Sequence, residues 1–501
     1  TTLPKPRKPL IGVITVYGYL VSFEDRQLYL KAITYALKND TIRGVIVVVD
    51  SPGGYASMAE DLYYSLKKLD KEKPVVTLVE GLAASGGYMV ALGGRHIIAE
   101  PSSFVGNIGV IVVSPFLVIP SEKVYDTGPY KFTGFSVKEF PKLVKDALNN
   151  FLDAVKESRG NKLKVSLKEL SLGKLYLGSE AFKLGLVDEL GSMLTAVKRL
   201  CEYSGIREYE IIDLLKTVSN ISGPLFGYTM WKNSTHLTIR DLIKYSKSPV
   251  GVYYLSPYFV TDYIRGGAIT QSFPQNWYYT SNVGDLKNAI LVDDSHKNYF
   301  NPALYGEFFG KIVERGGRVV MVSKDMNLVS LLEKKPKALI VFTPLAKYSE
   351  KEVEAIKKYL EKGGKLVIIY DTSLASASVV NDFSQNFGIY FSEGYLYNTE
   401  NNYWIYRNIY VDKLEKHPLF QNITKLVFFT ATTIYTNATP LAKTYATLSL
   451  TEKPGNYTVI ALNKNVLAIA DQTFIADPYL YAEDNYNFLN NLINYLLNTK
   501  E

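Results

Sequence analysis

A serine with small neighbours stands in the segment Gly81-Leu-Ala-Ala-Ser-Gly-Gly-Tyr88. Small side chains leave room for the backbone of a substrate, and a hydroxyl placed there can act as a nucleophile. The amides after Ser85 begin a predicted helix, where N–H groups can stabilise a developing oxyanion. Because serine is also a common helix N-cap, the segment alone leaves a purely structural role for Ser85 open.

A second glycine-rich turn, Asp50-Ser-Pro-Gly-Gly54, also joins a predicted strand to a predicted helix. Two glycines allow backbone amides to face a ligand at close range. Gly54 is therefore a candidate oxyanion donor beside Gly86, provided that the two turns are neighbours in one sheet. By itself the Pro-Gly-Gly sequence predicts only a change of chain direction.

The elements that must position these turns alternate between strand and helix over residues 10–218. Continuous β-branched runs predict buried parallel strands, and such α/β proteins place their sites at strand ends. We expect strands at 10–16, 44–49 and 75–79, and helices at 24–38, 57–69 and 85–92. A loop of small residues is expected between the strand at 75–79 and Ser85.

Seven segments, taken in order, resemble the signal peptide peptidase A family of serine peptidases, whose fold is shared by Clp protease and the crotonases. They are Ile11-Gly-Val-Ile14, Gly44-Val-Ile-Val-Val-Val-Asp-Ser-Pro-Gly-Gly54, Lys73-Pro-Val-Val76, Ala84-Ser-Gly-Gly-Tyr88, Gly106-Asn-Ile-Gly-Val110, Thr127-Gly-Pro-Tyr-Lys-Phe132 and Gly178-Ser-Glu-Ala-Phe-Lys-Leu-Gly-Leu-Val-Asp-Glu-Leu-Gly191. The resemblance covers roughly residues 10–200 and implies an N-terminal Clp/crotonase-like domain.

The resemblance implies that Ser85 is the nucleophile and Lys131 the general base of a Ser/Lys dyad. It also implies an oxyanion hole and a set of residues that support the site. The oxyanion donors are Gly54 and Gly86, and the supporting residues are Gly53, Gly87 and Asn107. The family usually has serine where Asn107 stands, so the role of Asn107 is the least secure part of the comparison.

A lysine accepts a proton only when it is neutral, so the pKa of Lys131 must fall from about 10.4 through burial. Its neighbours Pro129, Tyr130, Phe132 and Phe135 are apolar, which favours burial. Without the motif, an ordinary surface lysine is the default interpretation.

Composition excludes several other chemistries. The single cysteine, Cys201, rules out intramolecular disulfides and a cysteine-based metal cluster. Four histidines leave few bases for a Ser-His-Asp triad, and we interpret His96 as structural. The net charge of +7 is spread evenly, which disfavours nucleic acid as a partner. The Ser/Lys mechanism requires no metal, nucleotide or organic cofactor.

Residues 286–501 predict a second α/β domain, which resembles the flavodoxin-like fold of class I glutamine amidotransferases. Strands are expected at 289–292, 318–322, 338–342, 365–370 and 466–470, with helices at 349–362 and 485–497. Amidotransferase chemistry needs a cysteine after a strand, where this chain has Ile369-Tyr-Asp-Thr-Ser373. We therefore expect a non-catalytic module for assembly, substrate capture or partner docking. Asp371 and Asp471 at strand ends either bind a ligand or cap turns.

The expected organisation is a linker at 1–9, the peptidase domain at 10–218, a connector at 219–285 with a strand near 250–255, and the second domain at 286–501. The family resemblance implies a homo-oligomer in which a neighbouring subunit can supply the base. Six Asn-x-Ser/Thr sequons favour a secreted protein or one at the extracellular face of the membrane. No apolar run is long enough to span a bilayer, so any membrane anchor is expected outside this chain.

The function predicted from the sequence is a serine endopeptidase that degrades signal-peptide remnants or other membrane-proximal peptides. Three alternatives stay open at this point. They are a peptidase dedicated to one membrane protein, of the stomatin-directed type; a scaffold whose peptidase fold has lost activity; and a crotonase-type acyl-CoA enzyme. The last would normally lack the Ser85/Lys131 pair.

Overall fold

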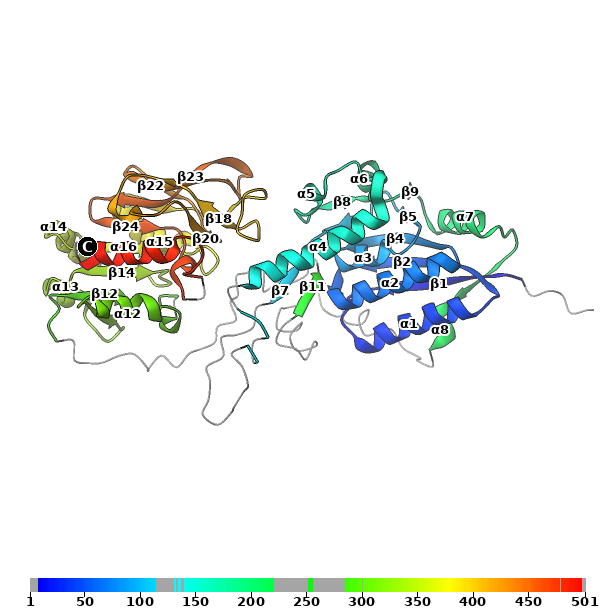
Figure 1. The fold of residues 1–501 in the computed structure, drawn as a ribbon, viewed down its shortest axis with the longest axis horizontal. Helices are drawn as coiled ribbons and strands as arrows, with labels where there is room; N and C mark the ends of the chain where they lie inside the picture. Colours follow the sequence, from blue (N-terminus) through cyan, green and yellow to red (C-terminus); the bar gives the residue numbers. More distant parts are fainter. Residues whose placement is uncertain are drawn as a thin grey trace, which may run out of the picture. The chain divides into compact units, whose positions relative to one another are not determined.

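The computed structural model describes residues 8–113, 130–131, 134–136, 139–219, 251–255, 284–299, 301–477 and 479–497. The chain divides into two compact units, residues 1–267 and 268–501, which are each described by themselves (Figure 1). Several predicted features lie outside the described residues. These are positions 1–7 of the linker, 127–129 and 132 of the lysine motif, the sequons at Asn220 and Asn233, and most of the connector.

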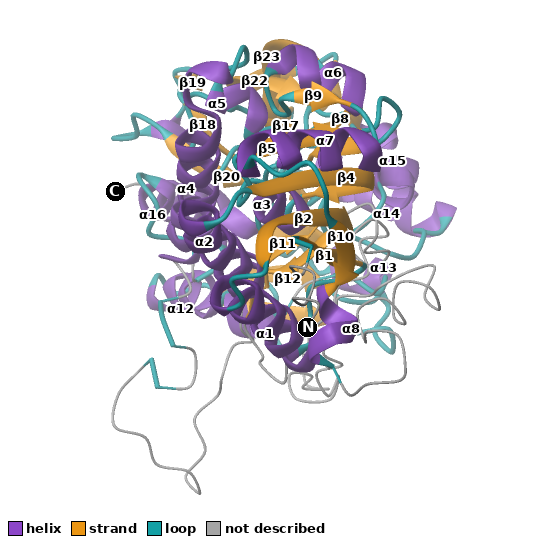
Figure 2. Cartoon of the chain, turned by 90° about the vertical axis from the view of Figure 1, so that its right-hand side faces the viewer, coloured by secondary structure: helices purple, strands orange, loops and turns teal. Residues whose placement is uncertain are grey.

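A largely parallel sheet of eight strands forms the centre of the N-terminal unit. Its main path runs β10-β1-β2-β4-β5-β9, while β6 pairs with β4 and β8 pairs with β6. Figure 2 shows β1, β2, β4, β5 and β9 stacked in this order. The bounds are β1 (Leu10–Tyr17), β2 (Ile42–Ser51), β4 (Val75–Ala84), β5 (His96–Ala99), β6 (Phe104–Gly106), β8 (Leu175–Leu177), β9 (Glu189–Leu190) and β10 (Glu210–Asp213).

Helices cover both faces of this sheet, which explains why its strands are apolar on both sides. Val45, Val47 and Val49 of β2 join a core with α1 (Phe23–Lys38) and α2 (Ala56–Glu72). The alternate residues of β2, Ile46 and Val48, pack in a second core with α7 (Met193–Ser204). The other helices are α3 (Gly86–Ala91), α4 (Phe140–Arg159), α5 (Leu167–Leu170), α6 (Gly178–Leu184) and α8 (Leu214–Val218).

The predicted strand at 75–79 is longer than expected. It continues as β4 through Ala84, so the predicted loop of small residues before Ser85 was wrong. The extension forms because Leu82, Ala83 and Ala84 pair with β6, a strand about twenty residues further along the chain. Ser85 therefore follows directly on a strand that is hydrogen-bonded on both sides.

A small second sheet lies beside the main one and includes the strand predicted in the connector. Its order is β3-β11-β7, with β3 at Gly53–Tyr55, β11 at Gly251–Leu255 and β7 at Ile111–Val113. The central strand, β11, is antiparallel to both neighbours. The connector therefore contributes a strand to the N-terminal unit.

The C-terminal unit is built on a nine-stranded mixed sheet. The order is β13-β12-β14-β15-β24-β23-β22-β17, with β19 also paired to β22. The first five strands are parallel and the rest antiparallel. Their bounds are β12 (Ala289–Asp293), β13 (Arg318–Val322), β14 (Ala338–Phe342), β15 (Lys365–Ile369), β17 (Leu396–Tyr397), β19 (Lys413–Leu414), β22 (Thr439–Leu448), β23 (Lys453–Asn463) and β24 (Val466–Ile469).

Five α-helices and two small ribbons complete the described part of the C-terminal unit. The helices are α12 (Gly306–Glu314), α13 (Leu328–Glu333), α14 (Glu350–Glu361), α15 (Ala377–Ser384) and α16 (Asn485–Leu497). The ribbons pair β16 (Ile389–Phe391) with β21 (Ile434–Thr436), and β18 (Asn408–Val411) with β20 (Leu426–Phe429). Across the described residues of both units, none of the helices combines the length and the apolar character needed to cross a bilayer.

One buried ion pair fastens α4 to the main sheet. The Arg159 guanidinium donates to both carboxylate oxygens of Asp188, at 2.8 and 2.9 Å, and to the Gly185 carbonyl at 2.9 Å. The side chains of Arg159 and Asp188 are 1% and 8% exposed, whereas that of Lys162, a second partner of Asp188, is 52% exposed. Burial acts to raise the pKa of Asp188, but these cations and the Ile97 amide outweigh it and bring the pKa to about 2.

Replacing Arg159 with leucine should destabilise the N-terminal unit by about 3–5 kcal/mol, because Asp188 would stay buried without its main partner. Lys162→Ala should cost at most about 1 kcal/mol, since that pair is solvent-exposed. The measurement is hydrogen exchange of the strands of the N-terminal unit in increasing urea. Because the folded pKa of Asp188 lies below its ordinary value of about 4, the Arg159 contribution should be full above about pH 4 and disappear as the pH falls toward 2. Equal losses in the two variants would contradict this assignment.

Candidate active site

Ser85 occupies a strained position between β4 and α3. Its φ of 54° and ψ of −118° fall in a region that costs a residue with a side chain about 1–3 kcal/mol. The Ser85 amide donates to the Gly106 carbonyl at 2.8 Å, and the Ser85 carbonyl accepts from the Met89 amide at 3.0 Å. Both backbone groups are thus fixed, and strain of this kind is typical of residues held in place for function.

The structure brings the Ser85 turn close to Ser51, just before β3, the short strand that Gly53 and Gly54 begin where the sequence predicted a turn. A Cβ added to Gly87 would lie 2.4 Å from the Ser51 carbonyl oxygen, so the start of α3 touches the end of β2 backbone to backbone. A Cβ on Gly54 would lie 2.2 Å from the Leu20 carbonyl oxygen. The two predicted oxyanion donors, Gly54 and Gly86, therefore come from turns that contact each other.

Ser51 organises the second turn, and the sequence reasoning assigned it no role. Its hydroxyl donates to the Gly18 carbonyl at 2.7 Å and accepts from the Gly53 amide at 3.1 Å. A serine hydroxyl that accepts from the amide two residues later forms a common type of local turn. In the sequence, the signal for this role is a serine two residues before a glycine. In the structure that glycine, Gly53, has a positive φ.

Asn107 supports the segment that faces the Ser85 hydroxyl. Its side-chain amide donates to the Gly173 carbonyl at 2.6 Å, and its backbone amide donates to the Lys174 carbonyl at 2.7 Å. Two residues later, the Gly109 carbonyl accepts from the Ser85 hydroxyl at 3.5 Å. Asn107 therefore positions the chain opposite Ser85 through hydrogen bonds to Gly173 and Lys174.

Lys131 lies in a turn with Tyr130, whose carbonyl accepts from the Gly134 amide at 2.6 Å. The Lys131 side chain is exposed, whereas the sequence reasoning expected it to be buried. Among the residues that the structure describes, Lys131 makes no hydrogen bond to Ser85. The structure thus assembles the nucleophile and the two glycine turns, and the pairing with Lys131 stays a prediction.

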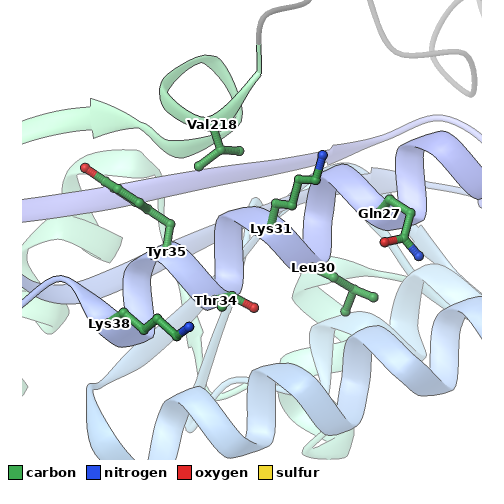
Figure 3. A pocket seen from close by; sticks show the side chains of 7 residues that line it. All are labelled: Gln27, Leu30, Lys31, Thr34, Tyr35, Lys38 and Val218. Atoms are coloured by element: carbon green, nitrogen blue, oxygen red, sulfur yellow. The ribbon is translucent and has the colours of Figure 1, made fainter.

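The remaining candidates of the N-terminal unit have structural surroundings. His96 begins β5 and its ring nitrogens lie 3.1 Å from Glu189 and 3.1 Å from Tyr203. Cys201 is half-buried in α7. A hollow on the outer side of α1, closed by Val218 of α8, contains none of the residues predicted for catalysis (Figure 3). It is lined by Gln27, Leu30, Lys31, Thr34, Tyr35, Lys38 and Val218.

The two strand-end carboxylates of the C-terminal unit are fully buried and engaged in turns. Asp371 accepts from the amide and hydroxyl of Ser373, at 2.9 and 2.5 Å, and from the Thr473 hydroxyl at 3.0 Å. Asp471 accepts from the amides of Phe429 and Thr473, at 2.5 and 2.7 Å. Burial is the main cause that raises the pKa of both groups. At Asp471, repulsion by the Asp371 carboxylate raises the pKa further. Of the two roles considered from the sequence, these contacts favour turn capping.

A buried histidine cluster in the same unit was not predicted. His296 lies 2.9 Å from Asp293 and 3.5 Å from Glu352, and its ring stacks on Tyr348 at a centroid distance of 3.6 Å. Burial acts to lower the pKa of His296, but Asp293 and Glu352 outweigh it and raise the pKa. The cluster fastens the loop after β12 to the start of α14. Asp293 and His296 are three residues apart, but Tyr348 and Glu352 come from a distant segment, so only the fold reveals the complete cluster.

Gly87→Ala should destabilise the protein by about 2–3 kcal/mol, because the new methyl group would overlap the Ser51 carbonyl. Gly310, in α12, is the matched control, since a Cβ there has no neighbour within 4 Å. Gly310→Ala should instead stabilise by about 1 kcal/mol through helix propensity. Unfolding free energies of both variants provide the measurement. Stabilisation by Gly87→Ala would show that the turns do not touch as described.

Part of the N-terminal unit is similar to known proteases. The family model for peptidase family S49 matches residues 67–207, which include Ser85 and Lys131. A candidate protease of Methanocaldococcus jannaschii is 35% identical over 207 residues, covering 38% of this chain and 65% of that protein. A candidate protease of Synechocystis is 33% identical over 196 residues, covering 36% of this chain and 70% of that protein. This chain thus spans just under two thirds of the first relative and slightly more of the second.

A solved structure of a membrane-bound stomatin-specific protease also aligns with this chain, at 16% identity and a TM-score of 0.29. The alignment covers 41% of this chain and 99% of that one. A likeness at this level carries no argument about function. The sequence identity to the Synechocystis protein, together with the family model, assigns the chain to peptidase family S49.

Proposed function

We propose that this protein is a serine endopeptidase in which Ser85 is the nucleophile and Lys131 the general base. The observation that carries the proposal is the strained backbone of Ser85 together with the close contact between Gly87 and the Ser51 carbonyl, two residues before β3. This contact supports an arrangement in which the amides of Gly54 and Gly86 serve an oxyanion formed at Ser85, as acyl transfer through a tetrahedral intermediate requires. Family S49 membership supports the same activity.

In the proposed mechanism, neutral Lys131 removes the proton of the Ser85 hydroxyl as its oxygen attacks the peptide carbonyl. The amides of Gly54 and Gly86 hold the oxyanion. When the C–N bond breaks, the leaving amine takes the proton from Lys131 and an acyl-enzyme remains on Ser85. Water, deprotonated by Lys131, then releases the acyl group and regenerates Ser85. Gly53, Gly87 and Asn107 shape and support the site, and no cofactor takes part.

The exposed position of Lys131 makes assembly part of the proposal. An ammonium in water keeps its proton, so Lys131 becomes a base only when something covers it. We infer that a second copy of the chain or the bound substrate provides this cover. A homo-oligomer, expected from the family resemblance, would allow Lys131 to act on Ser85 of its own chain or of a neighbour.

The proposed substrates are extended peptides near a membrane, with signal-peptide remnants as the first candidate. The seven-segment resemblance to signal peptide peptidase A supports this choice, as does the expected location on the extracellular face of the membrane or outside the cell. A peptidase dedicated to one membrane protein, of the stomatin-directed type, is the second candidate. The Gly128-Pro-Tyr-Lys131 motif and its spacing from Ser85 favour the first.

For the C-terminal unit we propose a non-catalytic role in assembly, substrate capture or partner docking. Its five parallel strands follow the order 2-1-3-4-5 when numbered along the chain, which supports the predicted flavodoxin-like fold. Position 371 carries a buried aspartate in the region where an amidotransferase needs a cysteine. Among the described residues of this strand end, the cysteine that a glutaminase uses as its nucleophile is therefore lacking.

Ser85→Ala and Lys131→Ala should each reduce peptide cleavage at least 10³-fold, because each removes one half of the dyad. Lys142→Ala is the control, since Lys142 is an exposed lysine on the nearby helix α4, and its rate should stay within about twofold. Cleavage of a quenched fluorescent peptide with small apolar residues is measured, with circular dichroism to verify folding. A folded Lys131→Ala variant with full activity would overturn the dyad.

Asp371→Asn should leave peptide cleavage unchanged and raise the stability of the C-terminal unit at pH 8. The folded pKa of Asp371 is raised, so its contribution is most favourable below about pH 4 and is lost as the pH rises through the folded pKa. Asparagine can keep the contacts with Ser373 and Thr473 without the charge. Unfolding free energies at pH 5 and pH 8 test this. A larger drop between these pH values in the variant than in the native protein would contradict it.

A further inference from the structure

The strand contributed by the connector lies between the two strands that flank Ser85. On one side Tyr253, Tyr254 and Leu255 of β11 pair with Tyr55, Gly54 and Gly53 of β3. On the other side Gly251, Val252 and Tyr253 pair with Val113, Val112 and Ile111 of β7. Both ladders are antiparallel, so an extended segment of the chain is hydrogen-bonded between β3 and β7.

This gap is the place where a peptide would have to lie to be attacked by Ser85. β3 contains Gly54, the proposed oxyanion donor, and β7 begins two residues after Gly109, the carbonyl opposite the Ser85 hydroxyl. β11 also lies against α3, the helix that Ser85 begins. Strand addition between two such edges is a general way to bind extended peptides, because main-chain hydrogen bonds do not depend on sequence.

Two further observations describe the state of the site with β11 in place. Ser85 is only 1% exposed, so an external peptide cannot reach its hydroxyl unless part of the structure moves. The Lys131 side chain is exposed and, among the described residues, makes no hydrogen bond to Ser85. The structure therefore combines a buried nucleophile with a proposed base that is exposed and not bonded to it.

We propose that β11 is an internal inhibitor, which occupies the peptide-binding groove and must leave before an external peptide can bind. The proposal rests on the proposed peptidase function. It adds that, before substrate binds, the peptide-binding groove is occupied by residues 251–255 of the same chain. A competitor of this kind raises the apparent KM by the reciprocal of the fraction of molecules in which the groove is open, and leaves kcat unchanged.

A disulfide lock tests whether β11 occupies the groove. In a Cys201→Ser background, which has no other cysteine, Val112→Cys and Val252→Cys place thiols at directly paired positions. Paired residues in antiparallel strands have Cα atoms about 4.5–5.5 Å apart, which suits a disulfide. The control combines Val112→Cys with Tyr253→Cys, because neighbouring positions on a strand present opposite faces. Mild oxidation should crosslink the first pair at least fivefold faster than the second.

The crosslinked form should cleave the fluorescent peptide at least tenfold more slowly at low substrate concentration, and a reducing agent should restore the rate. Equal crosslinking of both cysteine pairs would refute the pairing of β11 with β7. A fully crosslinked protein with an unchanged rate would refute inhibition. Since crosslinking is read by mass and needs no activity, a chain that cleaves no peptide in any form would refute the proposed function and still reveal where β11 lies.

The opposite change should activate the enzyme. Tyr253→Pro with Tyr254→Pro removes two adjacent amides of β11, which point to opposite sides of the strand, so the segment can no longer pair fully with either β3 or β7. The apparent KM should fall at least fivefold with kcat unchanged. A synthetic peptide of residues 249–257, added to this variant, should inhibit competitively and return the KM toward that of the native chain. An unchanged KM in a folded variant would overturn the proposal.

Discussion

The contact between Gly87 and the Ser51 carbonyl is the constraint on which the proposed site depends. It joins the start of α3 to the end of β2 without any side chain between them. Because van der Waals repulsion rises steeply as two atoms approach, even one methyl group at Gly87 would push the two segments apart. Ser85 lies two residues before Gly87 and β3 begins two residues after Ser51, so this contact helps to set the distance between the proposed nucleophile and the proposed oxyanion donors.

The local elements around this contact could be predicted from the sequence. The β-branched run of β2 and the helical spacing of α1 depend on neighbours within a few residues, and both are present within one or two residues of the expected bounds. The extension of β4 to Ala84 was not predictable, because it requires β6 as a partner. The hairpin of β22 and β23 was missed for the same reason, since its residues carry a mixed pattern whose burial depends on both β24 and β17.

The candidate site divides in the same way. The place of Ser85 between a strand and a helix was predictable from the local sequence, whereas Gly53 and Gly54 begin the short strand β3 where a turn was expected. The state of Lys131 was not, because exposure is a property of everything that packs around a residue, including other copies of the chain. Ser51 and the cluster around His296 were overlooked because partners that complete them, Gly18 for Ser51 and Tyr348 and Glu352 for His296, are brought close only by the fold.

Polar groups in the two units are buried under different electrostatic conditions. Arg159 and Asp188 compensate each other, so the carboxylate keeps its charge in the interior. Asp371 and Asp471 have hydrogen-bond donors and no cation of their own among the described contacts, so burial favours their neutral forms. A buried pair of this second kind is compatible with a structural role and is a poor ligand site for an anion.

The location of β11 within the same polypeptide has a kinetic consequence. A segment joined covalently to its binding groove is present at an effective concentration on the order of millimolar, whatever the concentration of the protein. Dilution therefore does not free the groove, and a freely diffusing peptide at micromolar levels competes poorly. Substrates that are themselves confined near the enzyme, for instance on a shared membrane surface, reach comparable local concentrations. Selectivity would then follow from where a peptide is held as well as from its sequence.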